Sequence, residues 1–138
     1  MARARGSGSR ALRVVEAAVT CLQREDFDAL ASWLDPDVEV STLATGREPV
    51  RGRDAVLETM RDAIARMYSI ELTRYEQVDD DTVLGFGRAR FPLEPHGFGE
   101  GTMTWLFELR GERLVRVRAF QEPDAAWEAI RARSPARD

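Results

Sequence analysis

The feature that most constrains the fold is a change in the spacing of apolar residues near Tyr68. Upstream of this point they recur every three or four positions, which is typical of amphipathic helices, and downstream they alternate, which is typical of half-buried strands. The alternating part predicts four strands, at about 69–78, 82–92, 99–110 and 113–122. Because the connections between them are short, consecutive strands are expected to pair as an antiparallel meander.

Two helices are predicted in the first part of the chain. Residues 1–9 are rich in Gly, Ser and Arg, so we expect a flexible tail there. The first helix carries one apolar stripe, formed by Leu12, Val15, Val19 and Leu22. Asp26 is the predicted N-cap of a second, short helix with an apolar side formed by Phe27, Leu30 and Trp33 or Leu34. Pro36, in Asp35-Pro36-Asp37, cannot donate the next helical hydrogen bond and is expected to end it.

A short strand and the longest helix are predicted next. Residues 38–43 alternate and are rich in β-branched side chains, which indicates a strand. The helix begins past Gly52, pairs Asp62 with Arg66 on its wet side, and buries a stripe of Leu57, Met60, Ile64 and Met67. After the meander, Pro123 occupies the first turn of a last helix with Trp127 and Ile130 inward.

Together these elements predict one α+β domain over residues 10–132, followed by a tail at 133–138. A curved antiparallel sheet packs on three N-terminal helices, and a short C-terminal helix completes the domain. A length of 138 residues suits a single domain that buries roughly two-thirds of its unfolded surface.

The curvature is inferred from small residues in the strand at 82–92. Gly85, Gly87 and Ala89 share one face, where we expect them to let the strand bend and to leave volume above it. Alternation places the following residues on the pocket side of the last two strands: Met103, Trp105, Phe107, Leu109, Val115, Val117, Ala119 and Gln121. The opposite face of the last strand then carries Arg116, Arg118 and Phe120. The alternative is that the inward side chains simply fill the interior.

The charge pattern excludes several function classes. The net charge is −4 and the arginines are spread along the chain, so there is no basic footprint for nucleic acid. The sequence has no lysine, which excludes a Schiff base and a phosphate-binding loop of the Gly-Lys type. No segment reaches the ~20 apolar residues of a membrane span, so we expect a soluble, cytoplasmic protein without a membrane partner. Cys21 has no partner for an internal disulfide and is interpreted as a small buried hydrophobe, which fits a reducing compartment.

Few side chains are candidates for chemistry. His96 lies near Glu94 and Glu100 in sequence, so it is the candidate acid or base at the pocket mouth, although an exposed loop histidine is the interpretation we favour. One histidine with two glutamates is too poor a set for a metal site, and the aspartates at 79–81 indicate a solvated turn. The Gly-Phe-Gly at 85–87 opens no helix and is not a dinucleotide-binding motif, so neither a metal nor a cofactor is expected.

Three stretches carry a resemblance to a known family. They are REDFDAL at 24–30 followed by LDPDV at 34–38, VRGRDAV at 50–56, and GERLVRVRAF at 111–120 running into 124–126. With these, residues 10–132 resemble the nuclear transport factor 2-like superfamily, in its SnoaL-like and ketosteroid-isomerase-like branch. The resemblance implies a cone with a pocket between the sheet and the helices, and a homodimer formed through the outer sheet face.

The resemblance does not bring an intact catalytic set with it. Where ketosteroid isomerases have a tyrosine and two acids, this sequence has Ala18, Ser41 and Trp105 or Thr104. Where polyketide cyclases have an acid on the last strand, it has Ala119. The same alanine follows Arg118 at a position where epoxide hydrolases need an acid.

Two kinds of function therefore remain open. The first is a domain that binds a hydrophobic, ring-containing small molecule, as an isomerase-, cyclase- or dehydratase-type enzyme without the known catalytic constellations, or without catalysis. The second is a non-catalytic dimerisation module with a filled interior. For the first, the residues expected at the pocket are Trp33, Ser41, Tyr75, Trp105, Val117, Ala119 and Gln121, with Ser41 and Gln121 as a convergent polar pair.

Overall fold

The computed structural model describes residues 2–45, 48–93 and 95–133, with the backbone alone for residues 2–9. Helices and one sheet make up this part of the chain, so the predicted α+β class is confirmed. In chain order the elements are α1 (Ala2–Gln23), α2 (Phe27–Ser32), β1 (Leu34–Ser41), the 3₁₀ helix η1 (Leu43–Thr45), β2 (Val50–Arg51), α3 (Arg53–Ala65), β3 (Ser69–Asp79), β4 (Thr82–Pro92), β5 (Phe98–Arg110), β6 (Arg113–Phe120) and α4 (Pro123–Arg133).

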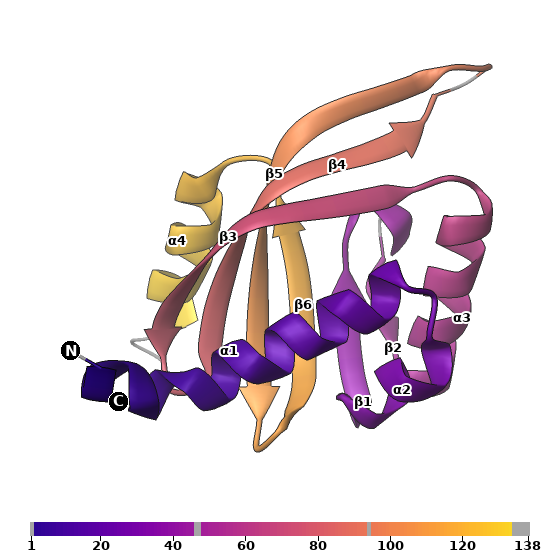
Figure 1. Cartoon of the computed structure of the whole chain (residues 1–138). Helices are drawn as coiled ribbons and strands as arrows, with labels where there is room; N and C mark the ends of the chain where they lie inside the picture. The colour runs from indigo at the N-terminus through magenta and orange to yellow at the C-terminus, as the bar shows by residue number, and fades with distance from the viewer. Residues whose placement is uncertain (1, 46–47, 94, 134–138) are drawn as a thin grey trace.

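The strands of the described residues form one six-stranded sheet in the order β2-β1-β6-β5-β4-β3. The strands β3 to β6 pair antiparallel in chain order, which confirms the predicted meander. The strand β1 pairs in parallel with β6, and β2 lies antiparallel at the far edge of β1. The sheet is curved and open, with β2 and β3 at its edges (Figure 1).

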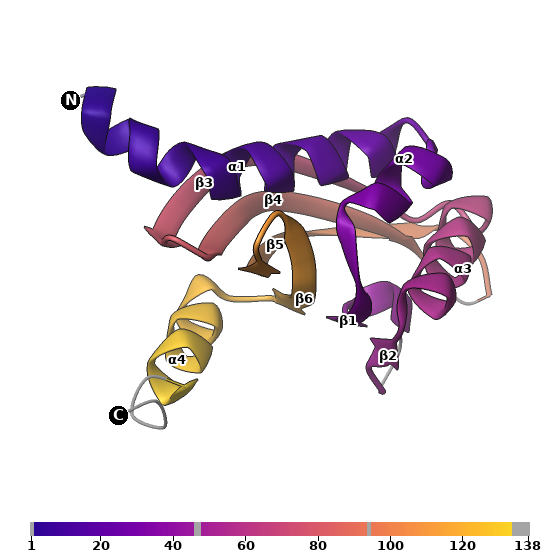
Figure 2. The same ribbon diagram turned by 90° about the horizontal axis from the view of Figure 1, so that it is seen from below.

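Helices lie on both faces of the sheet. On the inner face, α1 crosses β3 and β4 while α3 packs against β1 and β2, and on the outer face α4 contacts β5 and β6 (Figure 2). The main apolar core lies between the inner face and α1–α3. A smaller core under α4 consists of Leu84, Leu106, Ala126 and Ile130, with Phe86, Phe120 and Trp127 packed against it. The predicted inward residues of α4, Trp127 and Ile130, both belong to this core.

The meander strands lie within two residues of their predicted bounds, but the first strand differs. The strand β1 begins at Leu34 and therefore includes Asp35-Pro36-Asp37, which we expected to precede it, and it ends at Ser41 rather than at residue 43. Pro36 interrupts the strand instead of delimiting it, because the pairing with β6 shifts register between Leu34 and Glu39. There the Oδ1 atom of Asp35 accepts a hydrogen bond from the amide of Asp37 at 2.8 Å.

Most helix signals are confirmed. The Oδ1 atom of Asp26 caps α2 by accepting from the amide of Ala29 at 3.2 Å, and Arg66 pairs with Asp62 at 3.1 Å. Three details were wrong. The helix α2 ends at Ser32, so Leu34 belongs to β1 and Pro36 does not end the helix. The longest helix is α1 and not α3. Met67 is 62% exposed, because α3 ends at Ala65 and Met67 adopts a φ of 75° that turns the chain away from the helix.

The ends of the chain bear on the predicted domain bounds. The backbone of α1 is helical from Ala2, so a helix occupies the segment expected to be a tail, and the flexibility of residues 1–9 stays a prediction. Of the predicted tail at 133–138, Arg133 is the last residue of α4, and 134–138 lie outside the described residues. Within the described ranges, no helix combines the length and the apolar character needed to cross a bilayer.

The glycines of β4 bring neighbouring strands close together. A Cβ atom on Gly87 would lie 1.9 Å from the carbonyl oxygen of Glu71, next to an irregularity in β3 between Leu72 and Arg74. A Cβ on Gly85 would lie 2.4 Å from a methyl carbon of Leu72. The expectation that these glycines leave empty volume was wrong, because β3 occupies the space. Of the three small residues, only Ala89 borders the cavity described below.

The facing of β6 also differs in part from the prediction. Pairing with β5 shifts register between Glu108 and Leu109, so the alternation along β6 is interrupted near Val115. Leu114 therefore lies in the main core, whereas Val115 lines an open polar groove on the outer face. Beyond this bulge the predicted alternation is confirmed for Val117 and Ala119, which pack on the main core.

Candidate functional site

A cavity of about 490 Å³ lies between the inner face of the sheet and helices α1, α2 and α3. This volume is within the range of small-molecule sites. Its buried lining residues are all apolar: Ala18, Val19, Leu30, Leu34, Val40, Val56, Ala63, Ala89, Met103, Trp105, Phe107 and Leu114. The helices α1, α2 and α3 and the strands β1, β4, β5 and β6 all contribute to this wall, so the cavity depends on the packing of the helices on the sheet.

The polar lining residues are exposed or half-buried and mark the opening of the cavity. They are Gln23, Glu25, Thr42, Tyr68, Ser69 and Arg90. Two of them form hydrogen bonds with backbone groups. The side-chain amide of Gln23 donates to the carbonyl oxygen of Ile70 at 3.3 Å, and the hydroxyl of Thr42 accepts from the backbone amide of Ala44 at 3.2 Å. The cavity is therefore apolar in its depth and polar at its rim.

The end of α1 shapes one side of the opening. Glu25 adopts a φ of 60°, which is a left-handed conformation that reverses the chain after the helix. Asp26 then starts α2, and its amide donates back to the carbonyl oxygen of Cys21 at 2.9 Å. This turn carries Leu30 of α2 to the cavity wall.

Three of the predicted pocket residues line the cavity and four do not. Trp105, Val117 and Ala119 are part of the wall. Trp33 and Tyr75 pack on the main core without bordering the cavity. Ser41 lies between the lining residues Val40 and Thr42, so alternation turns it to the other face, and Gln121 is exposed beyond the end of β6. Ser41 and Gln121 thus form no convergent polar pair at the cavity.

Tyr75 is half-buried in the main core. Burial raises the pKa of its phenol above the usual value of 10.0, and the negative charge of Glu16 on α1 raises it further. The neutral phenol is therefore the favoured form, and this side chain packs as a core aromatic residue.

His96 is exposed in the connection between β4 and β5 and does not line the cavity. Of its acidic neighbours in sequence, Glu100 pairs with Arg88 at 3.0 Å, and Glu94 lies outside the described residues. Within the described part of the chain, no three His, Cys, Asp or Glu side chains are grouped closely enough to hold a metal ion.

Apolar residues stand on the wall where the resemblance places catalytic groups. Ala18 of α1, Trp105 of β5 and Ala119 of β6 all line the cavity, which brings together positions from three elements. Arg118 points to the outer face instead, where it lies 3.4 Å from Glu108. Three of the positions to which the resemblance assigns catalytic groups thus lie at the cavity with side chains that cannot transfer a proton, whereas Ser41, at a fourth position, does not line it.

Sequence reasoning did not name the helical half of the wall as part of the site. Val19 and Leu22 of α1 and Met60 and Ile64 of α3 line the cavity, although their stripes were read only as packing surfaces. Apolar periodicity identifies the buried side of a helix, but it does not distinguish a filled interface from one that borders a cavity.

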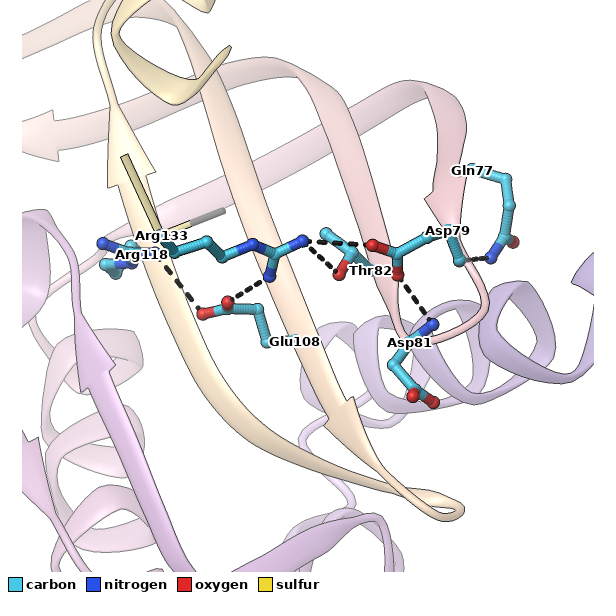
Figure 3. A network of polar contacts seen from close by, with 7 residues as sticks. All are labelled: Gln77, Asp79, Asp81, Thr82, Glu108, Arg118 and Arg133. Carbon is cyan, nitrogen blue, oxygen red and sulfur yellow. Dashed lines mark hydrogen bonds and ion pairs between the residues drawn. The ribbon is translucent and has the colours of Figure 1, made fainter. Parts of the chain in front are cut away.

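A network of charged side chains fastens α4 to the outer face, away from the cavity (Figure 3). The carboxylate of Glu108 accepts from Arg133 at 2.6 Å and from Arg118 at 3.4 Å. Arg133 also donates to Thr82 and Asp79, both at 3.1 Å. Burial lowers the pKa of Arg118, as does the charge of Arg116, while Glu108 opposes both effects. This network places Arg118 on the outer face, as predicted.

Comparisons with known proteins identify the fold. Among solved structures, the RV0760c protein of Mycobacterium tuberculosis in complex with estradiol-17beta-hemisuccinate is 14% identical, with a TM-score of 0.70 over 83% of this chain and 95% of that one. An LEH-like epoxide hydrolase of M. tuberculosis is 23% identical, with a TM-score of 0.69 over 83% of this chain and 80% of that one. A putative polyketide cyclase from Xanthomonas campestris is 21% identical, with a TM-score of 0.69 over 89% of this chain and 97% of that one.

None of the curated proteins matches the chain in sequence. A family model described as the SnoaL-like domain matches residues 15–117, which span most of the elements from α1 to β6. The match lies within the range predicted from the three sequence stretches. The chain therefore belongs to the SnoaL-like domain family of the nuclear transport factor 2-like superfamily.

Proposed function

We propose that this protein binds a small, mainly apolar, ring-containing molecule in the cavity between the sheet and α1–α3. The observation that carries the proposal is the combination of a volume of about 490 Å³ with a buried wall that is entirely apolar. Transfer of apolar surface out of water contributes about 25 cal/mol per Å², so such a wall favours a ligand with little polar surface. The polar rim accommodates a polar group at one end of the ligand.

The structural relatives support this class of ligand. RV0760c, which shares the fold, is crystallised with estradiol-17beta-hemisuccinate, and the TerC protein, with a TM-score of 0.68, is crystallised with polyporic acid. Both are ring-containing molecules. At 14% and 15% identity they support the chemical class and not a particular compound.

The residues deep in the cavity fit a role in binding best, because none of them can transfer a proton. An isomerase, cyclase or dehydratase needs a proton donor or acceptor within reach of the reacting atoms. Among the described lining residues the titratable ones are Glu25, Tyr68 and Arg90; Glu25 and Tyr68 belong to the rim, whereas alternation with Ala89 turns the side chain of Arg90 to the outer side of β4. A reaction of this type would have to take place at the opening, where Glu25 is the candidate base. Glu25→Gln would then abolish turnover and leave the affinity unchanged.

A homodimer through the outer sheet face remains a proposal from the family resemblance. The helix α4 covers the part of this face formed by Leu84, Leu106 and Phe120. The dimer contact would therefore use the part nearer β1, where Arg116 is partly exposed. Arg116→Glu should lower the mass measured by light scattering, whereas Arg131→Glu on α4 should not. An equal mass for both variants and the wild type would argue against this contact.

The binding proposal is tested with the fluorescence of Trp105. The chain has three tryptophans, and only Trp105 lines the cavity in the described residues, so the Trp33→Phe/Trp127→Phe variant reports on the cavity wall alone. Titration with trans-stilbene should quench this fluorescence to saturation and raise the melting temperature. If neither stilbene nor other apolar ring compounds change the fluorescence or the melting temperature, the proposal is wrong.

A further inference from the structure

The strands β4 and β5 continue beyond their neighbours as a two-stranded arm. The pairing of β3 with β4 ends at Ser69 and Arg90, and the pairing of β6 with β5 ends at Phe120 and Thr104. Residues 91–92 of β4 and 98–103 of β5 therefore pair only within this pair of strands. We call residues 89–92 and 98–103 the arm; Ala89 and Arg90, at its base, still pair with Ile70 and Ser69 of β3. In Figure 1 it rises away from the rest of the sheet, above α3.

The two faces of the arm differ in character. The outer side carries Arg88 paired with Glu100 at 3.0 Å, and Arg90 stacked over the ring of Phe98 at 4.4 Å. The inner side carries Ala89 opposite Gly101 and Phe91 opposite Gly99. An arm in water with nothing against it needs no apolar side, so the inner side indicates an occupant.

The inner side of the arm is a continuation of the cavity wall. Ala89 and Met103 line the cavity, and Gly101 lies between them and the tip. No described atom outside the immediate chain neighbours lies within 4 Å of the place where a Cβ of Gly101 would be. At Gly99 the same position is filled by the ring of Phe91, 2.5 Å away. The surface beside Ala89 is thus flat and open over Gly101 and is bounded by the ring of Phe91.

We propose that this surface is the outer half of the binding site, and that the ligand is an elongated, flat, apolar molecule whose distal end lies on Gly101 against Phe91. The inference rests on the binding function proposed above and adds the length and shape of the ligand. Two residues along a strand span about 7 Å, so the arm lengthens the site by about the width of one ring system. A compact ligand would reach only the enclosed part.

This surface is nearly flat, which favours a small ligand over a protein partner. Protein interfaces place large side chains at their centre, particularly aromatic residues and arginine. Here the centre is Gly101, which presents backbone and no side chain, and only Phe91 rises beside it. The direct continuity with Ala89 of the cavity wall connects this surface to the occupant of the cavity.

The test compares two rod-shaped probes that differ in length, trans-stilbene and diphenylhexatriene. Gly101→Leu places a side chain on the open surface, and because Gly101 does not have a left-handed φ, the substitution causes no backbone strain. This variant should weaken diphenylhexatriene binding about tenfold and leave stilbene binding within about twofold. Phe91→Ala is a second variant, and it should also weaken only the longer probe. The readout for both is the quenching of Trp105.

Thr102→Leu is the matched control, because Thr102 is the next residue of β5 and lies on the outer side, paired with Arg88. It should leave the binding of both probes unchanged. Wild-type protein that binds neither probe would overturn the binding function itself. Binding of both probes that Gly101→Leu leaves unchanged, or weakens equally, would overturn only the elongated site. A dimer that Gly101→Leu converts to a monomer would show that a second copy covers the arm, and would also overturn it.

Discussion

Trp105 of β5 and Ala119 of β6 are paired directly across the two strands, and both line the cavity. The resemblance to ketosteroid isomerases and polyketide cyclases assigns acidic groups to these two positions. A large aromatic ring beside a methyl group creates instead a flat apolar patch with a recess next to it. This pair therefore suits the face of a ring and offers no group for proton transfer.

The recess at Ala119 predicts a variant that separates binding from folding. Ala119→Leu adds three carbon atoms to the cavity wall, so it should weaken stilbene binding at least about tenfold while the free energy of unfolding stays within about 1 kcal/mol of the wild type. Fluorescence titration measures the first quantity and urea unfolding the second. Ala125→Leu, on the exposed side of α4, is the control and should change neither. Unchanged affinity in Ala119→Leu would place the ligand elsewhere.

Tyr75 predicts a loss of stability at alkaline pH. Burial, and secondarily Glu16, raise its pKa above 10.0 in the folded chain, so above that pH the unfolded chain loses the phenol proton first. The unfolded state then binds fewer protons than the native state, and the free energy of unfolding falls with pH, by at most about 1.4 kcal/mol per pH unit. The contribution is complete below pH 10.0 and disappears as pH rises through the raised pKa.

The measurement is urea unfolding of the wild type and two variants across this range of pH. Tyr75→Phe should reduce the alkaline loss of stability, while Tyr68→Phe, which removes the other tyrosine and keeps Tyr75, should retain it. The same slope in all three proteins would show that the ionisation of Tyr75 is not coupled to unfolding.

The contact between Gly87 and the backbone of β3 predicts a sharp difference between two glycines. Gly87→Ala should destabilise the protein by about 1–3 kcal/mol, because the new methyl group would lie 1.9 Å from the carbonyl oxygen of Glu71 and backbone must move to accommodate it. Gly101→Ala on the arm should change stability by no more than about 0.5 kcal/mol, since its Cβ position is open. Equal effects in urea unfolding would contradict the close approach of β3.

The hydrogen bonds of Arg133 predict how α4 is held. Arg133→Gln removes the 2.6 Å contact with Glu108 and the contacts with Asp79 and Thr82, so it should cost about 1–3 kcal/mol. The fluorescence of Trp127, a residue of α4 that packs on the smaller core, should change at a lower urea concentration than in the wild type. Arg131→Gln, on the exposed side of the same turn, should have little effect. If both variants unfold alike, the apolar contacts of α4 alone hold it.

Most of the fold could be predicted from local patterns because each pattern has one dominant physical cause. Alternation locates β3 to β6 because each of these strands has one apolar face, and Asp26 marks the start of α2 because its side chain satisfies a free amide. Pro36 misled the prediction because a proline signals an interruption without saying whether it precedes a strand or lies within one. Partial coverage of the outer face by α4 depends on tertiary packing and has no local signal.

The site was predicted less well, for geometric reasons. Alternation placed Trp105, Val117 and Ala119 on the cavity side correctly. The bulge near Val115 interrupts the alternation of β6, so Val115 was placed on the wrong face. Gln121 was expected at the cavity because it alternates with Ala119, and Ser41 was expected as its polar partner, yet Ser41 faces away and Gln121 lies beyond the end of β6. The glycines were taken to signal empty space, whereas they signal the approach of a neighbouring strand.

The parallel pairing of β1 with β6 has a consequence for biosynthesis. A chain emerging from the ribosome exposes Val38 and Val40 long before residues 113–120, which flank them in the finished sheet, have been made. Contacts between segments so distant in sequence form slowly, and an incomplete chain presents an unpaired apolar edge. The nascent protein should therefore depend on chaperones until translation has passed β6, and substitutions near Val117 should reduce its yield in cells more than they reduce its stability once folded.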